Sequence, residues 1–466
     1  MIKNSILPEK LTYIKNNRSY EKPPFGSELD LKSITLFVAS GFFFGDRTYF
    51  KDVKFLRSGE SFSNGKISKS KCRWYYEPRN ISFDTAVCEY TEIFESIIKD
   101  NLNNKNVILP LSGGLDSRTI AIASKKVTQK INSYSYSFDG GINENIFGNK
   151  IAKRLNIDHT SFLIKSGYLW NKIDELSDIN GCYAEFTHAR QIACIDDYNE
   201  LGDIFCLGHW GDVLFDNIGI PDDLPFDQQI KILKKSIFKE SGLELAFALW
   251  ELWGLDGDFN QYLDEIIMEE LSLINISSNA NANIRAFKSI HWAPRWNRVN
   301  LSIFEKYKPI FLPYYNEKIC EFVCKTPEKF LSNRKIQIEY IKRESPELAK
   351  IVWQENAPFN LYNYHWNKIP WNIPYRIKNK VSRIIQNRNF IQRNWELQFT
   401  GKLNQEQLEK RLFQNDNLNE FVPNSLVRNI YNSFCEIDSV YFSHSLSMIV
   451  TLGQFFSSYK IQKNEK

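Results

Sequence analysis

The stretch Val107-Ile-Leu-Pro-Leu-Ser-Gly-Gly-Leu-Asp-Ser-Arg118 decides the fold. Its first five residues, Val107 to Leu111, are apolar and few enough for a buried strand, and two glycines follow at once. Glycine allows a tight turn and a close approach of the backbone to a ligand. Since Thr119 to Lys126 has a helical pattern, the stretch predicts a strand, a loop and a helix, with the loop amides and the helix dipole directed at an anion.

The side chains of this loop indicate a site for phosphate groups. Ser112 and Ser117 offer hydroxyl donors, whereas the Asp116 carboxylate would repel a bare phosphate. An aspartate here favours Mg²⁺ held between the carboxylate and the phosphates. The string is not the GxxxxGK loop followed by Ser or Thr. A plain Gly-Gly surface turn is the alternative, and the strand before it and the helix after it argue against that alternative.

The flanking sequence predicts an α/β fold. A helix is expected from Ser82 to Leu102, with Ser82 as its N-cap, and another from Glu144 to Leu155. Further strands are expected at 131–138, 159–164 and 203–207, and edge strands at 66–77. Alternating strands and helices are typical of a parallel sheet with helices on both faces. From about residue 225 onward the pattern is mainly helical.

The composition is that of an ordinary globular protein. The chain has 466 residues, a formal net charge of +4 and 43% hydrophobic residues, so its charge does not argue for nucleic acid. The eight cysteines include no CxxC pair, and Cys320 and Cys324 are expected to be buried thiols rather than metal ligands. Residues 1–18 have no apolar signal-peptide core, and the longest apolar run, 34–45, is too short to span a bilayer. The expected location is the cytoplasm.

A basic, aromatic segment stands out near the C-terminal end. Residues 368–393 carry seven Lys or Arg and no acid, with Trp371, Tyr375 and Phe390 between them. We favour a solvated helical face for this segment. The alternative is a surface that grips the phosphates of RNA.

The loop at 111–117 resembles that of the ATP pyrophosphatases, enzymes that cleave ATP between its α and β phosphates. Several further segments of this chain resemble segments of the asparagine synthetase family and follow one another in the same order as in that family. The first, Gly41–Ser61, is similar to a late part of the family's glutaminase domain. The others are residues 144–159, 207–212, 311–316 and 335–346.

This resemblance implies a domain organisation and a ligand site. It implies an α/β ATP-pyrophosphatase domain over 81–360, a helical C-terminal extension over 361–466 and a small β-rich remnant of a glutaminase domain over 1–80. It also implies Mg²⁺ between Asp116 and Asp212, although Asp212 taken alone could simply cap a helix. The residues that would line the ATP-binding site are Leu111, Ser112, Gly113, Gly114, Asp116 and Ser117, with Gly208 beside the adenosine or the α-phosphate.

Three departures from the family bear on the chemistry. The family's glutaminase uses a cysteine directly after the initiator Met, whereas here Ile2 follows Met1 and the first cysteine is Cys72. His209 stands in the second glycine turn, either as a base or as a structural side chain. Asn356 occupies the place of a catalytic lysine, which implies either another cation, Lys335 or Arg298, that balances charge, or weakened catalysis. Lys335 taken alone could simply be a solvated helix residue.

The resulting hypothesis is an ATP-dependent ligase that joins a small-molecule or peptide carboxylate to an amine through an acyl-adenylate. The nitrogen would come from ammonia, an amine substrate or an ammonia-supplying partner, and aspartate is among the candidate acids. No membrane span and no nucleic-acid partner are expected. The alternatives are an RNA-modifying ATP pyrophosphatase and a non-catalytic nucleotide-binding homologue.

Overall fold

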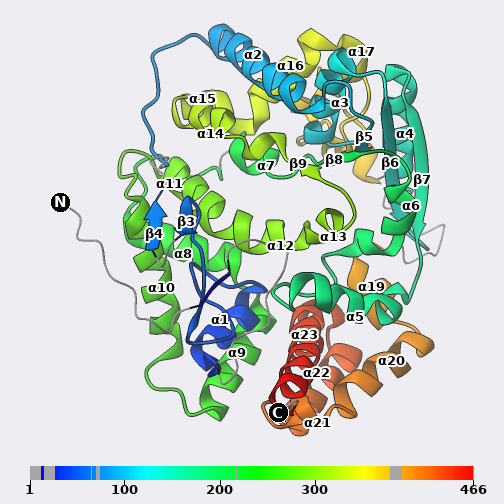
Figure 1. Ribbon diagram of the computed structural model, residues 1–466. Coiled ribbons are helices and arrows are strands. Elements are labelled where there is room, and N and C mark those ends of the chain that lie inside the picture. The colour runs from blue at the N-terminus through cyan, green and yellow to red at the C-terminus, as the bar shows by residue number, and fades with distance from the viewer. Residues whose placement is uncertain are drawn as a thin grey trace.

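A five-stranded parallel sheet lies in the upper right part of the molecule in Figure 1, with β7 at the edge. The computed structural model describes residues 12–14, 27–63, 66–69, 74–141, 143–216, 218–377 and 391–464, so Ile2 and Cys72 lie outside the described residues. The sheet has the strand order β7-β6-β5-β8-β9. Its strands are β5 (Val107–Pro110), β6 (Ile131–Phe138), β7 (Asp158–Ile164), β8 (Ile204–Cys206) and β9 (Ile310–Phe311).

Helices cover both faces of the sheet, as the alternating pattern predicted. Successive side chains of a strand point to opposite faces, so Val107 and Leu109 enter one hydrophobic cluster and Ile108 enters the other. The helices of the first cluster are α2 (Phe83–Leu102), α3 (Leu115–Val127), α4 (Asn145–Leu155), α14 (Glu317–Cys324) and α16 (Lys335–Glu344). Those of the second include α5 (Tyr168–Asn180), η1 (Arg190–Cys194), α6 (Ile195–Asn199) and α13 (Ser302–Glu305).

The predicted boundaries hold for most of these elements. Ser82 caps α2, because its Oγ accepts a hydrogen bond of 3.0 Å from the Thr85 amide. Helix α3 begins at Leu115, four residues before the predicted start at Thr119. The helix therefore starts within the glycine loop, and Asp116 and Ser117 belong to its first turn.

The strand order creates a crevice beside β5. From β5 the chain moves outward to β6 and then β7, and it returns on the other side of β5 as β8. Ligands of open α/β sheets bind where the order reverses, outside the carboxyl ends of the strands. The turns after β5 and β8, which are almost a hundred residues apart in the chain, therefore become neighbours.

The chain after residue 225 is mainly helical, as predicted. Between residues 207 and 366 the elements not yet named are α7 (Gly211–Leu214), α8 (Phe226–Ile237), α9 (Glu240–Leu252), α10 (Phe259–Ile274), α11 (Ala280–Phe287), the π-helix η2 (Lys288–Asn297), α12 (Arg298–Asn300), η3 (Pro313–Tyr315), α15 (Glu328–Leu331), η4 (Ser332–Arg334), α17 (Pro346–Ala349), η5 (Gln354–Asn356) and η6 (Tyr364–Trp366). The last helices are α19 (Asn394–Phe399), α20 (Lys402–Phe413), α21 (Asp416–Asn419), α22 (Asn424–Glu436) and α23 (Ser439–Asn464). In the described residues, no helix combines the length and apolarity that crossing a bilayer requires.

The N-terminal part is not simply β-rich. Its longest described element is the helix α1 (Leu31–Ser40), which packs against α9. The strands are short: β1 (Thr12–Ile14) pairs with β2 (Val53–Phe55), and β3 (Glu60–Ser63) pairs with β4 (Lys66–Lys69). The buried residues of α1 share one hydrophobic cluster with those of α23. The division into three domains stays a prediction.

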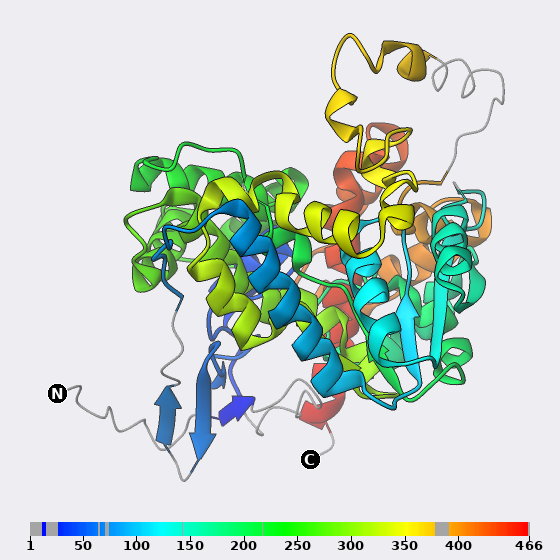
Figure 2. The same cartoon turned by 90° about the horizontal axis from the view of Figure 1, so that it is seen from above.

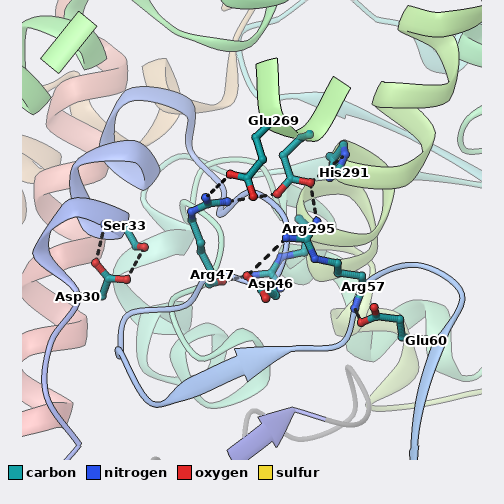
Figure 3. Close-up of polar contacts among 10 residues, drawn as sticks. Asp30, Ser33, Asp46, Arg47, Arg57, Glu60, Glu269, His291 and Arg295 are labelled. Carbon is teal, nitrogen blue, oxygen red and sulfur yellow. Dashed lines mark hydrogen bonds and ion pairs between the residues drawn. The ribbon is translucent and has the colours of Figure 1, made fainter. Parts of the chain in front are cut away.

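A buried charge network fastens this N-terminal part to the rest of the chain (Figure 3). Glu270 of α10 is fully buried, and its carboxylate lies 3.3 Å from Arg47 Nη1 and 2.5 Å from Arg57 Nη1. His291 of η2 lies 3.6 Å from the same carboxylate, and burial lowers the pKa of His291 to about 3, so its ring is neutral. Gly45 has a φ of +58°, and a Cβ there would lie 2.3 Å from Glu270 Oε1.

Candidate functional site

The loop after β5 is closed on itself by hydrogen bonds. The amide of Ser112 donates to Ser117 Oγ over 3.1 Å, and the amide of Gly114 donates to Ser112 Oγ over 3.2 Å. The amide of Gly113 donates to Gln354 Oε1 over 3.1 Å. The expectation that the loop amides face an anion is therefore wrong for these three, because side chains already occupy them. The amides that open α3 have no carbonyl four residues earlier in the helix, so they are the donors that remain for an anion.

Two residues with no role in the sequence analysis hold this loop in place. Gln354 packs so closely that a Cβ on Gly113 would lie 2.7 Å from its Cβ. Arg118 is fully buried and donates to the carbonyls of Gly113, Leu348, Ile351 and Val352 over 3.0–3.2 Å. Because four carbonyls accept hydrogen bonds from one guanidinium, Arg118 ties the loop to α17 and the segment that follows it. Burial lowers the pKa of Arg118 to about 10, so it stays charged at neutral pH.

A cavity of about 610 Å³ opens at the carboxyl ends of β5 and β8. Most of the predicted site residues line it: Leu111, Ser112, Gly114, Asp116, Ser117, Gly208, His209 and Asp212. Gly113 and Lys335 are not among its lining residues. Residues that the sequence analysis did not select also line it, among them Tyr134, Tyr136, Glu144, Gln191, Trp210, Lys288, Trp292, Trp296, Asn297, Arg334 and Glu355.

Asp116 is held firmly at the floor of this cavity. Its Oδ1 accepts a hydrogen bond of 2.8 Å from Gln337 Nε2 and a second from the Arg334 guanidinium. A Cβ on Gly211 would lie 2.0 Å from the same oxygen, so the second glycine turn must keep a glycine there. Gly208 also lies close, because a Cβ on it would be 3.3 Å from Asp116 Cβ. The carboxylate therefore has one defined orientation.

Neither of the two cations predicted to replace the family's lysine lines the cavity. Lys335 is exposed, and its Nζ donates to the carbonyl of Lys329 over 3.0 Å. Its neighbour Arg334 lines the cavity, because Asn333 and Arg334 adopt left-handed backbone conformations with φ of 55° and 58°. The other candidate, Arg298, pairs with Glu305 outside the cavity lining. Asn356 also points elsewhere, since its Oδ1 accepts a hydrogen bond of 3.1 Å from Asn367.

The π-helix η2 supplies one wall of the cavity, and the sequence analysis missed it. Lys288, Trp292 and Trp296 recur every four residues and all line the cavity, with Asn297 beside them. That spacing is the signal by which they could have been found. His291 and Arg295 of the same element instead reach the N-terminal part, where the Arg295 guanidinium donates to the Arg47 carbonyl over 2.6 Å (Figure 3). π-Helical turns are frequent at functional sites.

His209 lies in the cavity wall as an uncharged imidazole. Burial lowers the pKa of His209 to about 4, although Asp212 opposes the shift, and its Nδ1 is buried without a hydrogen-bond partner in the described residues. A general base works best with a pKa near the operating pH, so this imidazole is a weak base at neutral pH. The base role of His209 stays a prediction.

The donor set at the cavity fits Mg²⁺ bound together with phosphates. Among the described residues, no group of three or more His, Cys, Asp or Glu side chains forms a metal centre. Mg²⁺ is commonly held by one or two carboxylates and substrate phosphates, and Asp116 and Asp212 both line the cavity. One oxygen of Asp116 is engaged by Arg334 and Gln337, which leaves the other for a cation.

We expect Mg²⁺-dependent ATP binding to weaken below pH 6. Burial raises the pKa of Asp116 to about 6, Arg334 opposes the shift, and Asp212 adds to it. This pKa lies above that of an unfolded aspartate, so the folded protein loses stability as the pH rises through 6 and Asp116 becomes ionised. Metal binding has the opposite preference, because Mg²⁺ binds the ionised carboxylate. The affinity should fall about tenfold for each pH unit below 6. Titration calorimetry from pH 5 to 8 measures this effect, and a flat profile would contradict it.

The fold and the site together define the class of protein: an α/β domain with a parallel sheet, in which a glycine loop and two aspartates line one cavity. Residues 93–193 match the family model for asparagine synthase. This match covers α3, the loop before it and most of the sheet, and it supports an ATP-using, ligase-type enzyme. No curated protein matches the chain.

Three solved structures are similar to parts of this chain. An NH3-dependent NAD synthetase from Campylobacter jejuni is 12% identical, with a TM-score of 0.21, and the match covers 41% of this chain and 94% of that one. An NMN synthetase from Francisella tularensis is 14% identical, with a TM-score of 0.23 and coverages of 48% and 97%. The U34-tRNA thiolase NcsA from Methanococcus maripaludis is 11% identical, with a TM-score of 0.21 and coverages of 62% and 84%.

Proposed function

We propose that this protein is an ATP-dependent ligase that activates a carboxylate as an acyl-adenylate and transfers the acyl group to an amine or ammonia. The observation that carries the proposal is that Asp116 and Asp212, from turns far apart in the chain, line one cavity with the glycine loop. The match of residues 93–193 to the asparagine synthase family supports the same reading.

Different residues of the cavity bind different parts of the ATP–Mg²⁺ complex in this proposal. The amides that open α3 receive phosphate oxygens, and the Ser112 and Ser117 hydroxyls, 3.1 Å apart, keep the loop in shape. Asp116 and Asp212 would hold Mg²⁺, which would offset the charge of the triphosphate. Arg334 keeps Asp116 in its orientation and adds positive charge to the cavity.

The reaction then needs positioning and charge stabilisation. An oxygen of the substrate carboxylate attacks the α-phosphorus, the bond to the β-phosphate oxygen breaks, and pyrophosphate leaves. The amine nitrogen attacks the acyl carbon, the bond to the AMP oxygen breaks, and the amine gives its proton to solvent. Lys288 and Arg334 are the cations of the cavity that can stabilise the charge of these steps.

Carboxylate-dependent exchange of labelled pyrophosphate into ATP tests the proposal. The purified protein would be screened with a panel of acids that includes aspartate, aromatic amino acids and short peptides. Hydroxylamine added to the same reactions would trap an acyl-adenylate as a hydroxamate. Exchange together with hydroxamate formation for at least one acid supports the ligase. Pyrophosphate release without any acid, or release of ADP in place of AMP, would contradict it.

Lys288 is the best candidate for the cation that the family places at the position of Asn356. Burial lowers its pKa while Asp212 opposes the shift, and its Nζ lies 5.9 Å from the Trp292 ring centroid. We expect Lys288→Ala to lower kcat for pyrophosphate exchange by about 10²-fold, because a preorganised cation is lost. Lys335→Ala is the matched control and should leave kcat within about twofold, since its side chain is exposed. Equal losses in the two variants would refute the assignment.

A further inference from the structure

The segment from Tyr362 to Ile377 carries an unusual cluster of exposed apolar side chains. Of the 17 large apolar side chains that are exposed in the described part of the chain, six lie in these 16 residues, with exposed fractions of 40–68%. They are Tyr362, Trp366, Ile369, Trp371, Ile373 and Ile377. In Figure 2 the gold ribbon of this segment projects away from the rest of the molecule. We call the segment 362–377 the apolar arm.

Two asparagine side chains of the apolar arm point inward. Asn372 is only 2% exposed, and its Nδ2 donates to Asn367 Oδ1 over 3.2 Å. Asn367 in turn donates to Asn356 Oδ1 over 3.1 Å, which ties the arm to the segment behind the glycine loop. On the outside, the rings of Trp366 and Trp371 stack with centroids 5.9 Å apart. Polar amides inside and apolar side chains outside are the reverse of the arrangement expected for a surface that faces water.

The charged side chains within the apolar arm have one sign. Lys368 and Arg376 are exposed within it. The sequence contains no Asp or Glu from Asn356 through Trp395, and seven Lys or Arg lie between Lys368 and Arg393, four of them at positions outside the described residues. An anionic surface therefore complements this part of the chain.

The chemistry of the exposed side chains distinguishes a lipid surface from a nucleic acid. Nucleic acids bind basic side chains through their phosphates and aromatic side chains through stacking of the bases. They provide no apolar environment in which an isoleucine side chain could be buried. Ile369, Ile373 and Ile377 are aliphatic and exposed in the same short segment as Trp366 and Trp371. Trp, Ile and Lys or Arg together are the residues that settle at the interface of a bilayer, where rings and aliphatic groups enter and the cations remain at the headgroups.

We propose that the apolar arm docks this protein on the surface of an anionic lipid bilayer. Trp366, Ile369 and Trp371 enter the interface, and Lys368 and Arg376 contact the phosphate headgroups. The protein does not cross the bilayer in this proposal. The docking is separate from the proposed ligase reaction, because no residue of the apolar arm lines the cavity.

Vesicle sedimentation of the full chain tests the proposal. The probes are vesicles of phosphatidylcholine alone and of phosphatidylcholine with 30% phosphatidylglycerol. We expect at least tenfold tighter binding to the anionic vesicles, because each basic residue near such a surface strengthens binding by roughly fivefold. The combined change Ile369→Ser and Trp371→Ser should lower binding to the anionic vesicles at least tenfold. Leu273→Ser is the matched control, since Leu273 is 64% exposed on α10, and should leave binding unchanged.

Three results would overturn the proposal. The first is the absence of binding to anionic vesicles, or binding that Ile369→Ser and Trp371→Ser do not change. The second is salt-sensitive binding of a single-stranded 20-mer RNA that outcompetes the vesicles, which would assign the segment to nucleic acid. The third is a self-associated form, seen by analytical ultracentrifugation, that these two changes dissociate while vesicles remain unbound. Circular dichroism of each variant shows that any loss of binding does not come from unfolding.

Discussion

Replacing Asp116 by asparagine is expected to lower kcat/KM for carboxylate-dependent pyrophosphate exchange by about 10³-fold, or about 4 kcal/mol of transition-state stabilisation. The amide keeps the shape of the side chain and can still accept hydrogen bonds from Arg334 and Gln337. The change removes the negative charge that would hold Mg²⁺ and balance Arg334. The loss should therefore appear mainly in catalysis and metal affinity rather than in the fold.

The control for this prediction is Asp178→Asn, an exposed aspartate on α5 that lies outside the cavity lining. It should keep exchange within about twofold of the wild type. Thermal unfolding of both variants separates loss of catalysis from loss of structure. Wild-type exchange by Asp116→Asn would remove Asp116 from the proposed site.

Replacing Glu270 by alanine is expected to destabilise the protein by about 3–5 kcal/mol. The fully buried carboxylate pairs with Arg47 and Arg57, whose side chains are only 17% and 24% exposed, so its loss leaves two largely buried guanidinium groups without their nearest acid (Figure 3). The cavity left by the side chain adds to the cost. A shift of the urea midpoint to lower concentration measures the effect.

Glu269 provides a control on the same helix. Its side chain is 58% exposed and lies 3.5 Å from Arg47, so Glu269→Ala should cost no more than about 1 kcal/mol. Comparable losses in the two variants would show that the network contributes through surface charge and not through burial. Because His291 and Arg295 join the network to η2, we also expect Glu270→Ala to lower pyrophosphate exchange below the level that the loss of folded protein explains.

The local sequence pattern predicted most strands of the sheet and several of the helices beside them. The apolar run at 107–111 forms a strand up to Pro110, the alternation at 131–138 forms another, and the helix after Ser82 has the predicted cap. These elements depend on periodicity and on capping, which are properties of neighbouring residues. The resemblance to the asparagine synthetase family also implied that Asp116 and Asp212 would share one site, and both aspartates line the same cavity.

The parts of the site that sequence reasoning missed depend on the path of the chain in space. Lys335 and Arg334 are adjacent cations, and only the left-handed turn at Asn333 and Arg334 decides which of them reaches Asp116. Arg118 stands in the recognised string, but its four carbonyl partners include three from a segment more than two hundred residues away. The wall formed by Lys288, Trp292 and Trp296 depends on where η2 packs.

The sequence by itself determined the parallel sheet and the glycine loop, because strand and helix periodicity and backbone freedom at glycine are local properties, whereas the pairing of Asp116 with Asp212 was implied only by the resemblance to the asparagine synthetase family. Only the tertiary structure decided which cation accompanies Asp116, which loop amides remain for an anion, and that the apolar arm turns its amides inward. Those choices follow from the packing of segments distant in the chain, and such packing sets side-chain direction and burial in a way that no local pattern encodes.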